Sequence, residues 1–256
     1  MSSPANGAGL KGNVMLYSNP EQLNSVAHAH LGLNKAPNPY RYASSAHFIP
    51  LQVCEFGLAA VNYPIVFAGD DRLPVAIMSI RPEQNLFVTS DGYFQKDAYI
   101  PAFLRRYPFI LAEDPQSDRL IVCIDRAAEA LAPGGDEALF ADGEPTAFTQ
   151  SAIEFCSNFE AERRRTNNFV ALMAKYELFE VKEVAFMPSN SDGSASGRLK
   201  IADYFAVSEE KLGNLPPEII SELNSSGALS QIHAHLLSLF NWEKLMLRTL
   251  LDGPLS

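Results

Sequence analysis

The sequence predicts an α+β fold in which packed helices, including a long C-terminal helix, cover a mixed, mainly antiparallel sheet. Short runs rich in valine and isoleucine are joined by turn-like segments, which is typical of antiparallel strands. Apolar residues recur at helical spacing over residues 146–179 and again after residue 228. Strands and helices do not alternate regularly, which disfavours a doubly wound fold. We expect a single domain at residues 21–256, after a flexible lead-in at residues 1–20.

The first third of the chain predicts a loop, a helix and a hairpin. Prolines and other turn formers predict a loop from Gly32 to Arg41, with ordered structure resuming near His47. Residues 50–63 carry apolar side chains at helical spacing behind a leading proline, so we expect a helix there. The apolar runs 64–68 and 74–80 flank a turn-like GDDRL segment and predict an antiparallel hairpin.

The middle of the chain predicts smaller elements around a long helix. Residues 85–88 are expected to add a third strand, and residues 98–107 a short helix that ends before Pro108. Residues 119–125 read RLIVCID, which predicts a strand, whereas the acidic, glycine-rich segment 132–144 predicts a surface loop. The apolar stripe that follows predicts the long helix at 146–179, either unbroken or bent.

The last third predicts two strands followed by helices. Residues 179–187 alternate apolar and charged side chains, which indicates a half-buried strand, and residues 199–207 predict a second one. Ser208 precedes a glutamate-rich turn and is expected to cap a short helix. The prolines at 216–217 predict the start of another helix, and the final helix is expected at about 228–250.

Composition narrows the classes of partner and compartment. Hydrophobic residues make up 47% of the 256 residues and the formal net charge is −10, so we expect a globular protein that does not bind nucleic acid or an anionic membrane. No window has the 18 uninterrupted apolar residues of a membrane span. The first residues carry no continuous apolar segment, so we expect no signal peptide and a cytoplasmic location. Cys54, Cys123 and Cys156 lack a metal or redox spacing, so we expect three reduced thiols that pack as small hydrophobic groups.

Two HxH motifs raise the question of a metal site. His28 and His30 would point to the same side only if their segment is extended. His233 and His235 lie in a predicted helix, where residues two apart diverge by about 200°. We therefore predict no metal and no cofactor. The sequence also lacks a GxGxxG loop, a GxxxxGK[ST] loop and a GxSxG elbow, so no catalytic residue is predicted.

Several polar and aromatic side chains are candidates for ligand binding. Glu55 lies beside a predicted core face and would need a cationic partner there, for which Arg105 or Arg106 is available. One interpretation of the arginine pair is that one braces the core while the other is solvated. The other is a guanidinium fork that binds a carboxylate or a peptide beside nearby aromatic rings. The candidate ligand-binding residues are Glu55, Asn85, Tyr99, Arg105, Arg106 and Tyr107, with Asn85 also interpretable as a turn-stabilising amide.

The blocks YPIVF, NLF and YIPAFLRRYPF stand at a spacing that resembles the SapC family, and TNNFVALMAKYELFE and GRLKIADYFAVSEEKLGNL resemble further family segments. Phe94 replaces a tryptophan-like position of the family pattern, and the segment around residues 178–197 is less regular. The resemblance implies a soluble bacterial protein. Relatives are often encoded near TonB-dependent receptors and flavin-dependent tryptophan halogenase-like proteins, which implies an accessory role in nutrient uptake or in modifying a small molecule or peptide.

Two functions from different classes stay open at this point. The favoured one is a non-catalytic binding or accessory protein that recognises a peptide, a protein partner or a small ligand. The alternative is an uncharacterised enzyme acting on a small molecule or peptide, metal-assisted through His28 and His30. An enzyme requires a pocket with convergent polar groups. An accessory protein requires an exposed apolar patch or a self-complementary face, and a homo-oligomer is left open.

Overall fold

The computed structural model describes residues 15–113, 120–186 and 199–252, and its fold is α+β, as predicted. Every strand pair in this part of the chain is antiparallel. The chain divides into two compact units, which we describe separately. Unit 1 comprises Met1–Ala43, Ser90–Tyr93 and Ala102–Ala161, and unit 2 comprises Ser44–Thr89, Phe94–Pro101 and Glu162–Ser256. The expectation of a single domain stays a prediction.

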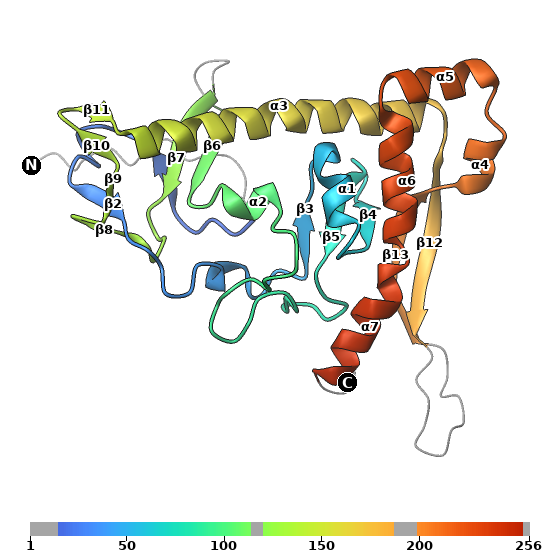
Figure 1. The fold of residues 1–256 in the computed structure, drawn as a ribbon, viewed down its shortest axis with the longest axis horizontal. Helices are drawn as coiled ribbons and strands as arrows, with labels where there is room; N and C mark the ends of the chain where they lie inside the picture. Colours follow the sequence, from blue (N-terminus) through green and yellow to red (C-terminus); the bar gives the residue numbers. More distant parts are fainter. Residues whose placement is uncertain (1–14, 114–119, 187–198, 253–256) are drawn as a thin grey trace, which may run out of the picture. The chain divides into compact units, whose positions relative to one another are not determined.

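Unit 1 contains three small sheets and three helical elements, the last of which is the first half of a long helix (Figure 1). The first sheet has the order β1 (Pro20–Gln22), β7 (Leu120–Asp125), β6 (Phe109–Glu113). The second has the order β8 (Leu131–Pro133), β2 (Leu31–Leu33), β9 (Glu137–Ala138), and the third pairs β10 (Phe140–Ala141) with β11 (Glu144–Pro145). The helical elements are a 3-10 turn at Arg41–Ala43, α2 (Ala102–Arg105) and the first half of α3 (Ala147–Lys175).

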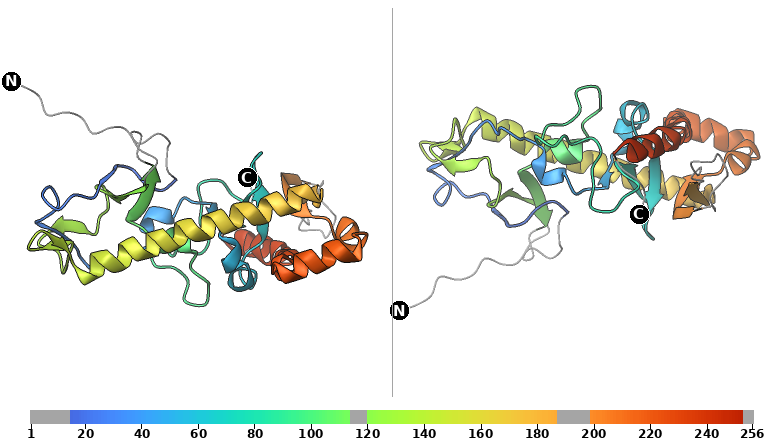
Figure 2. Two further views of the ribbon diagram at one scale, coloured as in Figure 1. Left: turned by 90° about the horizontal axis from the view of Figure 1, so that it is seen from above. Right: turned by 90° about the horizontal axis from the view of Figure 1, so that it is seen from below.

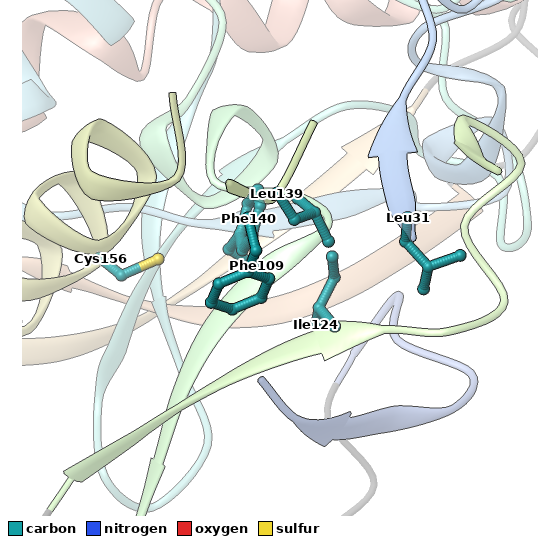
Figure 3. Packing of buried hydrophobic residues seen from close by; sticks show 6 residues of the cluster. All are labelled: Leu31, Phe109, Ile124, Leu139, Phe140 and Cys156. Atoms are coloured by element: carbon teal, nitrogen blue, oxygen red, sulfur yellow. The ribbon is translucent and has the colours of Figure 1, made fainter. Parts of the chain in front are cut away.

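The core of unit 1 joins side chains from all of these sheets to α3. Figure 3 shows the cluster, to which the strands contribute leucine, isoleucine and phenylalanine and α3 contributes a thiol. Its members are Leu31, Phe109, Ile124, Leu139, Phe140 and Cys156. All three cysteines are free, and Cys123 and Cys156 are buried and pack as small apolar groups, as predicted. Cys54 is exposed, so the expectation that it packs in the core is wrong.

Two glycines allow β2 to pass close to the turn before β9. A Cβ built on Gly32 would lie 2.5 Å from the carbonyl oxygen of Gly135, and one built on Gly135 would lie 2.5 Å from the carbonyl carbon of Gly32. Both obstacles are backbone atoms, so only residues without a side chain fit at these positions.

Unit 2 is built on a five-stranded sheet (Figure 1). The strand order is β12 (Phe179–Phe186), β13 (Leu199–Val207), β4 (Ile65–Ala68), β5 (Leu73–Ile77), β3 (Phe48–Pro50). The helical elements are a 3-10 turn at Val53–Glu55, α1 (Phe56–Ala59), the second half of α3, α4 (Glu209–Gly213), α5 (Pro217–Ser225), α6 (Ala228–Ser238) and α7 (Asn241–Leu251).

The centre of unit 2 is Phe67 on β4. Its ring lies 5.0 Å from the ring of Phe179 on β12 and 5.0 Å from the ring of His235 on α6, measured between centroids. Phe56 and Phe169 complete the aromatic cluster at 6.3 and 6.4 Å. One face of the sheet is therefore covered by side chains from α1, α3 and α6.

Strongly patterned segments fold as predicted. The hairpin of β4 and β5 forms in antiparallel register, and β12 pairs with β13 over most of its length. Figure 2 shows α3 as one unbroken helix in both views. Ser208 caps α4, because its side chain accepts a hydrogen bond from the backbone N–H of Lys211. The C-terminal segment is helical, as α6 and α7 with a junction at Leu239 and Phe240.

Weaker local patterns gave wrong boundaries. Ordered structure begins before His47, because β1 and β2 are held by partner strands distant in sequence, and β2 includes Gly32 from the expected loop. Residues 85–88 do not form a strand; Val88 makes an isolated bridge to Phe94. The helix expected at 50–63 is limited to Val53–Glu55 and α1, and short strands interrupt the loop expected at 132–144.

The N-terminal segment is described only in part. Residues 1–14, which make up most of the expected lead-in, lie outside the described residues. Tyr17 is buried and its hydroxyl donates a hydrogen bond of 2.8 Å to the carbonyl oxygen of Phe109. Residues just before β1 are therefore packed in unit 1. Among the helices of the described ranges, none is long and apolar enough to cross a membrane.

Candidate functional site

Unit 1 contains a cavity of about 840 Å³, which we call the unit 1 groove. Aromatic side chains from three separate segments line it, namely Tyr42, Tyr107 and Phe148. Its remaining lining comes mainly from two stretches of the chain, residues 33–39 and residues 127–137. The volume lies within the range of about 300–1,000 Å³ that is typical of small-molecule sites.

Two tyrosines form the aromatic part of the groove. The rings of Tyr42 and Tyr107 stack with centroids 4.0 Å apart and an interplanar angle of 18°. Tyr17 packs against Tyr107 at 5.3 Å. Burial raises the pKa of all three phenols above the ordinary tyrosine value. These hydroxyl groups therefore stay protonated and act as hydrogen-bond donors.

Asp125 anchors the backbone around the groove. Its carboxylate is buried and accepts hydrogen bonds of 2.9 Å from the N–H groups of Ser18 and Asn19 and of 3.0 Å from that of Ala127. The Tyr107 hydroxyl approaches the same carboxylate at 3.4 Å. Since several N–H groups converge on it, Asp125 fixes the lining rather than facing a ligand.

Residues 33–41 form one wall of the unit 1 groove, and hydrogen bonds hold both parts of this wall. Asn34 Oδ1 accepts a hydrogen bond of 3.1 Å from the N–H of Asp136 in the other wall. Gly92 packs against this wall with φ +77°, and a Cβ there would lie 2.6 Å from the Cβ of Asn38. The N–H of Tyr40 donates to the carbonyl oxygen of Gly92 at 2.9 Å. Only glycine combines this backbone angle with such close packing.

The groove presents charges of both signs. Lys35 and Arg41 contribute cations, and Glu129, Asp136 and Glu137 contribute carboxylates. All five residues are exposed. A ligand that carries both an ammonium and a carboxylate group therefore finds a partner for each.

We expect the hydroxyl groups of the two stacked tyrosines to contribute unequally to the free energy of unfolding. The Tyr42 hydroxyl donates to the carbonyl oxygen of Leu104 at 2.7 Å, whereas the Tyr107 hydroxyl is 3.4 Å from its acceptor. Tyr42→Phe should lower the free energy of unfolding by about 1 kcal/mol, and Tyr107→Phe by less than about 0.5 kcal/mol. Urea unfolding of both variants measures the difference. Equal losses would show that the distances do not govern the energies.

Of the candidate residues in unit 1, only Tyr107 lines the groove. The Arg106 guanidinium lies over the rings of Phe103 and Phe159 at 4.4 and 4.3 Å, and its Nε is buried without a hydrogen-bond partner. Arg105 is exposed, with its guanidinium 5.2 Å from the ring of Phe155. This arrangement matches the interpretation in which one arginine packs in the interior and the other meets solvent.

The other candidates lie in unit 2, where Glu55 and Tyr99 meet. Glu55 is buried, accepts a hydrogen bond of 2.8 Å from the Tyr99 hydroxyl and one of 2.9 Å from the N–H of Gln52. Asn85 Oδ1 accepts from the N–H of Phe87 at 2.9 Å, which is the turn-stabilising arrangement. The pairing of Glu55 with an arginine stays a prediction, and so does ligand binding by these residues.

The histidine motifs do not converge. His28 lies in a turn rather than in an extended segment; its ring is buried, with Nε2 2.8 Å from Glu21 Oε1, while His30 is exposed. His235 is buried and His233 exposed on α6, so that pair diverges as the helical repeat predicts. Within residues 15–113, 120–186 and 199–252, no three His, Cys, Asp or Glu side chains are placed to hold a metal ion.

Sequence patterns alone did not identify most of the groove. Residues 34–42 read NKAPNPYRY, which predicts a loop but carries no catalytic or metal-binding motif. Their partners at 107–108 and 127–137 are distant in sequence: Tyr42 stacks on Tyr107, and β2 pairs with β8 and β9. The density of tyrosine, asparagine and charged residues in this loop was the available signal, because exposed loops rich in such side chains often carry binding sites.

Comparison with known proteins gives one family match. The SapC family model matches residues 23–245, which is most of the chain. No curated protein and no solved structure matches the sequence or the fold.

Proposed function

The chain belongs to the SapC family, and from that premise we propose that it is a non-catalytic binding protein whose unit 1 groove takes a peptide or a small zwitterionic molecule. It would act as an accessory to nutrient uptake or to modification of that ligand. The observation that carries the proposal is the stacked pair Tyr42 and Tyr107 in a groove of about 840 Å³ that offers charges of both signs.

The chemistry of the lining favours binding over catalysis. Tyrosine offers a large contact area at a low cost in side-chain entropy, which is why it is frequent at recognition surfaces. The residues that line the groove include no histidine and no cysteine. Because burial raises the pKa of Tyr42 and Tyr107, neither phenol is a general base near neutral pH. An enzymatic function has less support, since His28 is buried against Glu21 and His30 is exposed.

The proposal also assigns the chain to the cytoplasm. Its support is the state of the thiols: Cys54, Cys123 and Cys156 are all unpaired, and desolvation by burial raises the pKa of Cys123 and Cys156 to about 11. Unreactive free thiols are usual in a reducing compartment. Protein partners and a homo-oligomer are compatible with this assignment.

A groove-blocking variant tests the proposal. Ala127 is exposed and lines the groove, so Ala127→Trp fills it while the backbone bond to Asp125 is kept. Ala29 is an exposed alanine of the same unit that does not line it, so Ala29→Trp is the matched control. We expect ligand-observed NMR with a panel of free amino acids, dipeptides and tripeptides to detect binding to the wild type and the control.

For every ligand that the wild type binds, Ala127→Trp is expected to raise the dissociation constant at least about tenfold, because the introduced ring occupies the volume of the ligand. Binding that persists unchanged in Ala127→Trp would move the site away from the groove. A wild type that binds nothing in the panel would contradict the proposed ligand class.

A further inference from the structure

The outer side of α6 and α7 carries an exposed stripe with a heptad spacing. Moving along the chain, the positions are separated alternately by three and four residues, which is the repeat of a coiled-coil seam. Four apolar members are largely exposed: Leu237 by 64%, Phe240 by 74%, Leu247 by 59% and Leu251 by 81%. The exposed polar members of the same repeat are Ser230, His233 and Lys244. We call these seven residues the α6–α7 stripe.

The opposite side of the same helices packs against the core of unit 2. Ile232, His235, Leu245 and Thr249 are buried on that side. Asn241 is buried there too, and its Nδ2 donates to the carbonyl oxygens of Ala60 and Tyr63 at 2.7 and 3.1 Å. One side of the helices therefore packs on unit 2, and the apolar members of the stripe take no part in that packing.

The stripe continues across the junction between the helices, where Figure 1 shows a change of direction. Leu239 and Phe240 keep right-handed helical angles, with φ −64° and ψ −21° and with φ −63° and ψ −17°. Their N–H groups bond to carbonyls three residues earlier, which is a tighter winding. In a straight α-helix, the heptad positions shift around the helix axis by about 20° per heptad. Each residue wound at about three per turn advances about 20° further than an α-helical residue, so the two junction residues offset about 40° of this shift. The junction therefore keeps the seven positions on one side.

We propose that the α6–α7 stripe is a self-association surface that packs antiparallel against the stripe of a second copy of this chain. An antiparallel seam pairs each first heptad position with a fourth position of the partner. A single register centred between Phe240 and Lys244 brings the two central leucines together and places Leu251 beside His233 of the second copy. Leu237 then faces Leu247 of the second copy, and the two-fold axis repeats the contact.

The polar members of the stripe favour the second copy in this orientation. In the antiparallel register Lys244 meets the Phe240 ring of the other chain, which is a cation–π arrangement, and the reciprocal contact forms as well. A parallel pair would instead place the two Lys244 ammonium groups against each other, which costs free energy. From Leu237 to Leu247, the second copy in the antiparallel direction is therefore the occupant whose chemistry matches the stripe.

Charge substitutions test both the partner and the direction. Leu237→Lys and Leu247→Glu each place a charge opposite a leucine twice in the antiparallel dimer, so each variant alone is expected to be monomeric in sedimentation velocity. The dissociation constant of the dimer should rise at least about tenfold in each case. When the two variants are mixed, the lysine meets the glutamate at one contact and leucine meets leucine at the other, so dimers should return. Leu58→Glu is the control, because Leu58 is exposed on α1 outside the stripe.

Each outcome bears on the proposal. A wild type and a Leu58→Glu variant that are dimeric, together with monomeric single variants and restored dimers in the mixture, support it. A monomeric wild type over the whole concentration series overturns it, including the case in which the stripe instead binds phosphatidylcholine vesicles. Single variants that stay dimeric, or a mixture that stays monomeric, overturn it as well. Circular dichroism of each variant confirms that the helices are folded.

Discussion

Replacing His235 by alanine is expected to lower the free energy of unfolding by about 3–5 kcal/mol at neutral pH, because two buried backbone groups lose their partner and a cavity forms. His235 Nε2 accepts a hydrogen bond of 3.0 Å from the N–H of Val207 on β13. Its Nδ1 donates to the carbonyl oxygen of Ile65 on β4 at 2.9 Å. The ring thus ties α6 to two adjacent strands at a point where their own ladder is nearly absent, since β4 and β13 share a single registered pair.

The same residue makes stability depend on pH. Burial lowers the pKa of His235 from 6.5 to about 4 in the folded chain. At pH values below 6.5 the unfolded chain binds a proton that the folded chain does not, so stability is lost as pH falls from 6.5 toward 4. The difference in unfolding free energy between wild type and His235→Ala should narrow by about 2 kcal/mol between pH 7.5 and pH 5.

Urea unfolding at the two pH values measures this effect, and His233→Ala is the matched control. His233 is exposed on the same helix, so its replacement should change stability by less than about 0.5 kcal/mol and leave the pH dependence of the wild type intact. If the wild type and His235→Ala lose stability in parallel as pH falls, His235 does not titrate as its burial requires.

Gly135→Ala is expected to lower the unfolding free energy by about 3 kcal/mol or more, because the added methyl group meets backbone that cannot rotate away. The new Cβ would lie 2.5 Å from the carbonyl carbon and oxygen of Gly32 and 2.9 Å from the N–H nitrogen of Leu33. Relief requires β2 to separate from the turn beside Asp136 and Glu137. Ligand binding in the unit 1 groove should therefore weaken together with stability.

Gly57→Ala is the control for this substitution. A Cβ at Gly57 meets no atom within 4 Å, and the residue lies in α1, where alanine is the better helix former by about 1 kcal/mol. We expect Gly57→Ala to be neutral or stabilising in thermal unfolding. A Gly135→Ala variant that is as stable as the wild type would mean that the two backbone segments can move apart without cost.

Elements with strong local patterns were predictable from the sequence. The hairpin at β4 and β5 has two β-branched runs around a turn, and Ser208 is followed at once by two glutamates, so short-range chemistry decides both. Elements decided by distant partners were not predictable. The sequence at Gly32 is typical of the start of a loop, but the residue lies in β2 because it pairs with strands β8 and β9. The run at 85–88 looks like a strand, but the Asn85 side chain bonds to the N–H of Phe87 and turns the chain.

In the candidate site too, some residues could be predicted from the local sequence and others could not. Tyr107 was identified because it adjoins a dense aromatic and arginine cluster, and it does line the groove. Tyr42 and the carboxylates at 129 and 136–137 were missed, because their segments carry no catalytic or metal-binding motif. Their positions in the groove depend on the stacking of Tyr42 on Tyr107 and on the antiparallel pairing of β2 with β8 and β9, which are long-range features.

Native mass spectrometry of the chain purified from cells that encode it, with metal analysis of the same sample, tests the central claim most directly. We expect a small molecule or short peptide bound at one copy per chain, retained by Ala29→Trp and lost from Ala127→Trp. A stoichiometric metal ion, or a bound mass that Ala127→Trp keeps, would contradict the assignment of this chain as a binding protein that acts through the unit 1 groove.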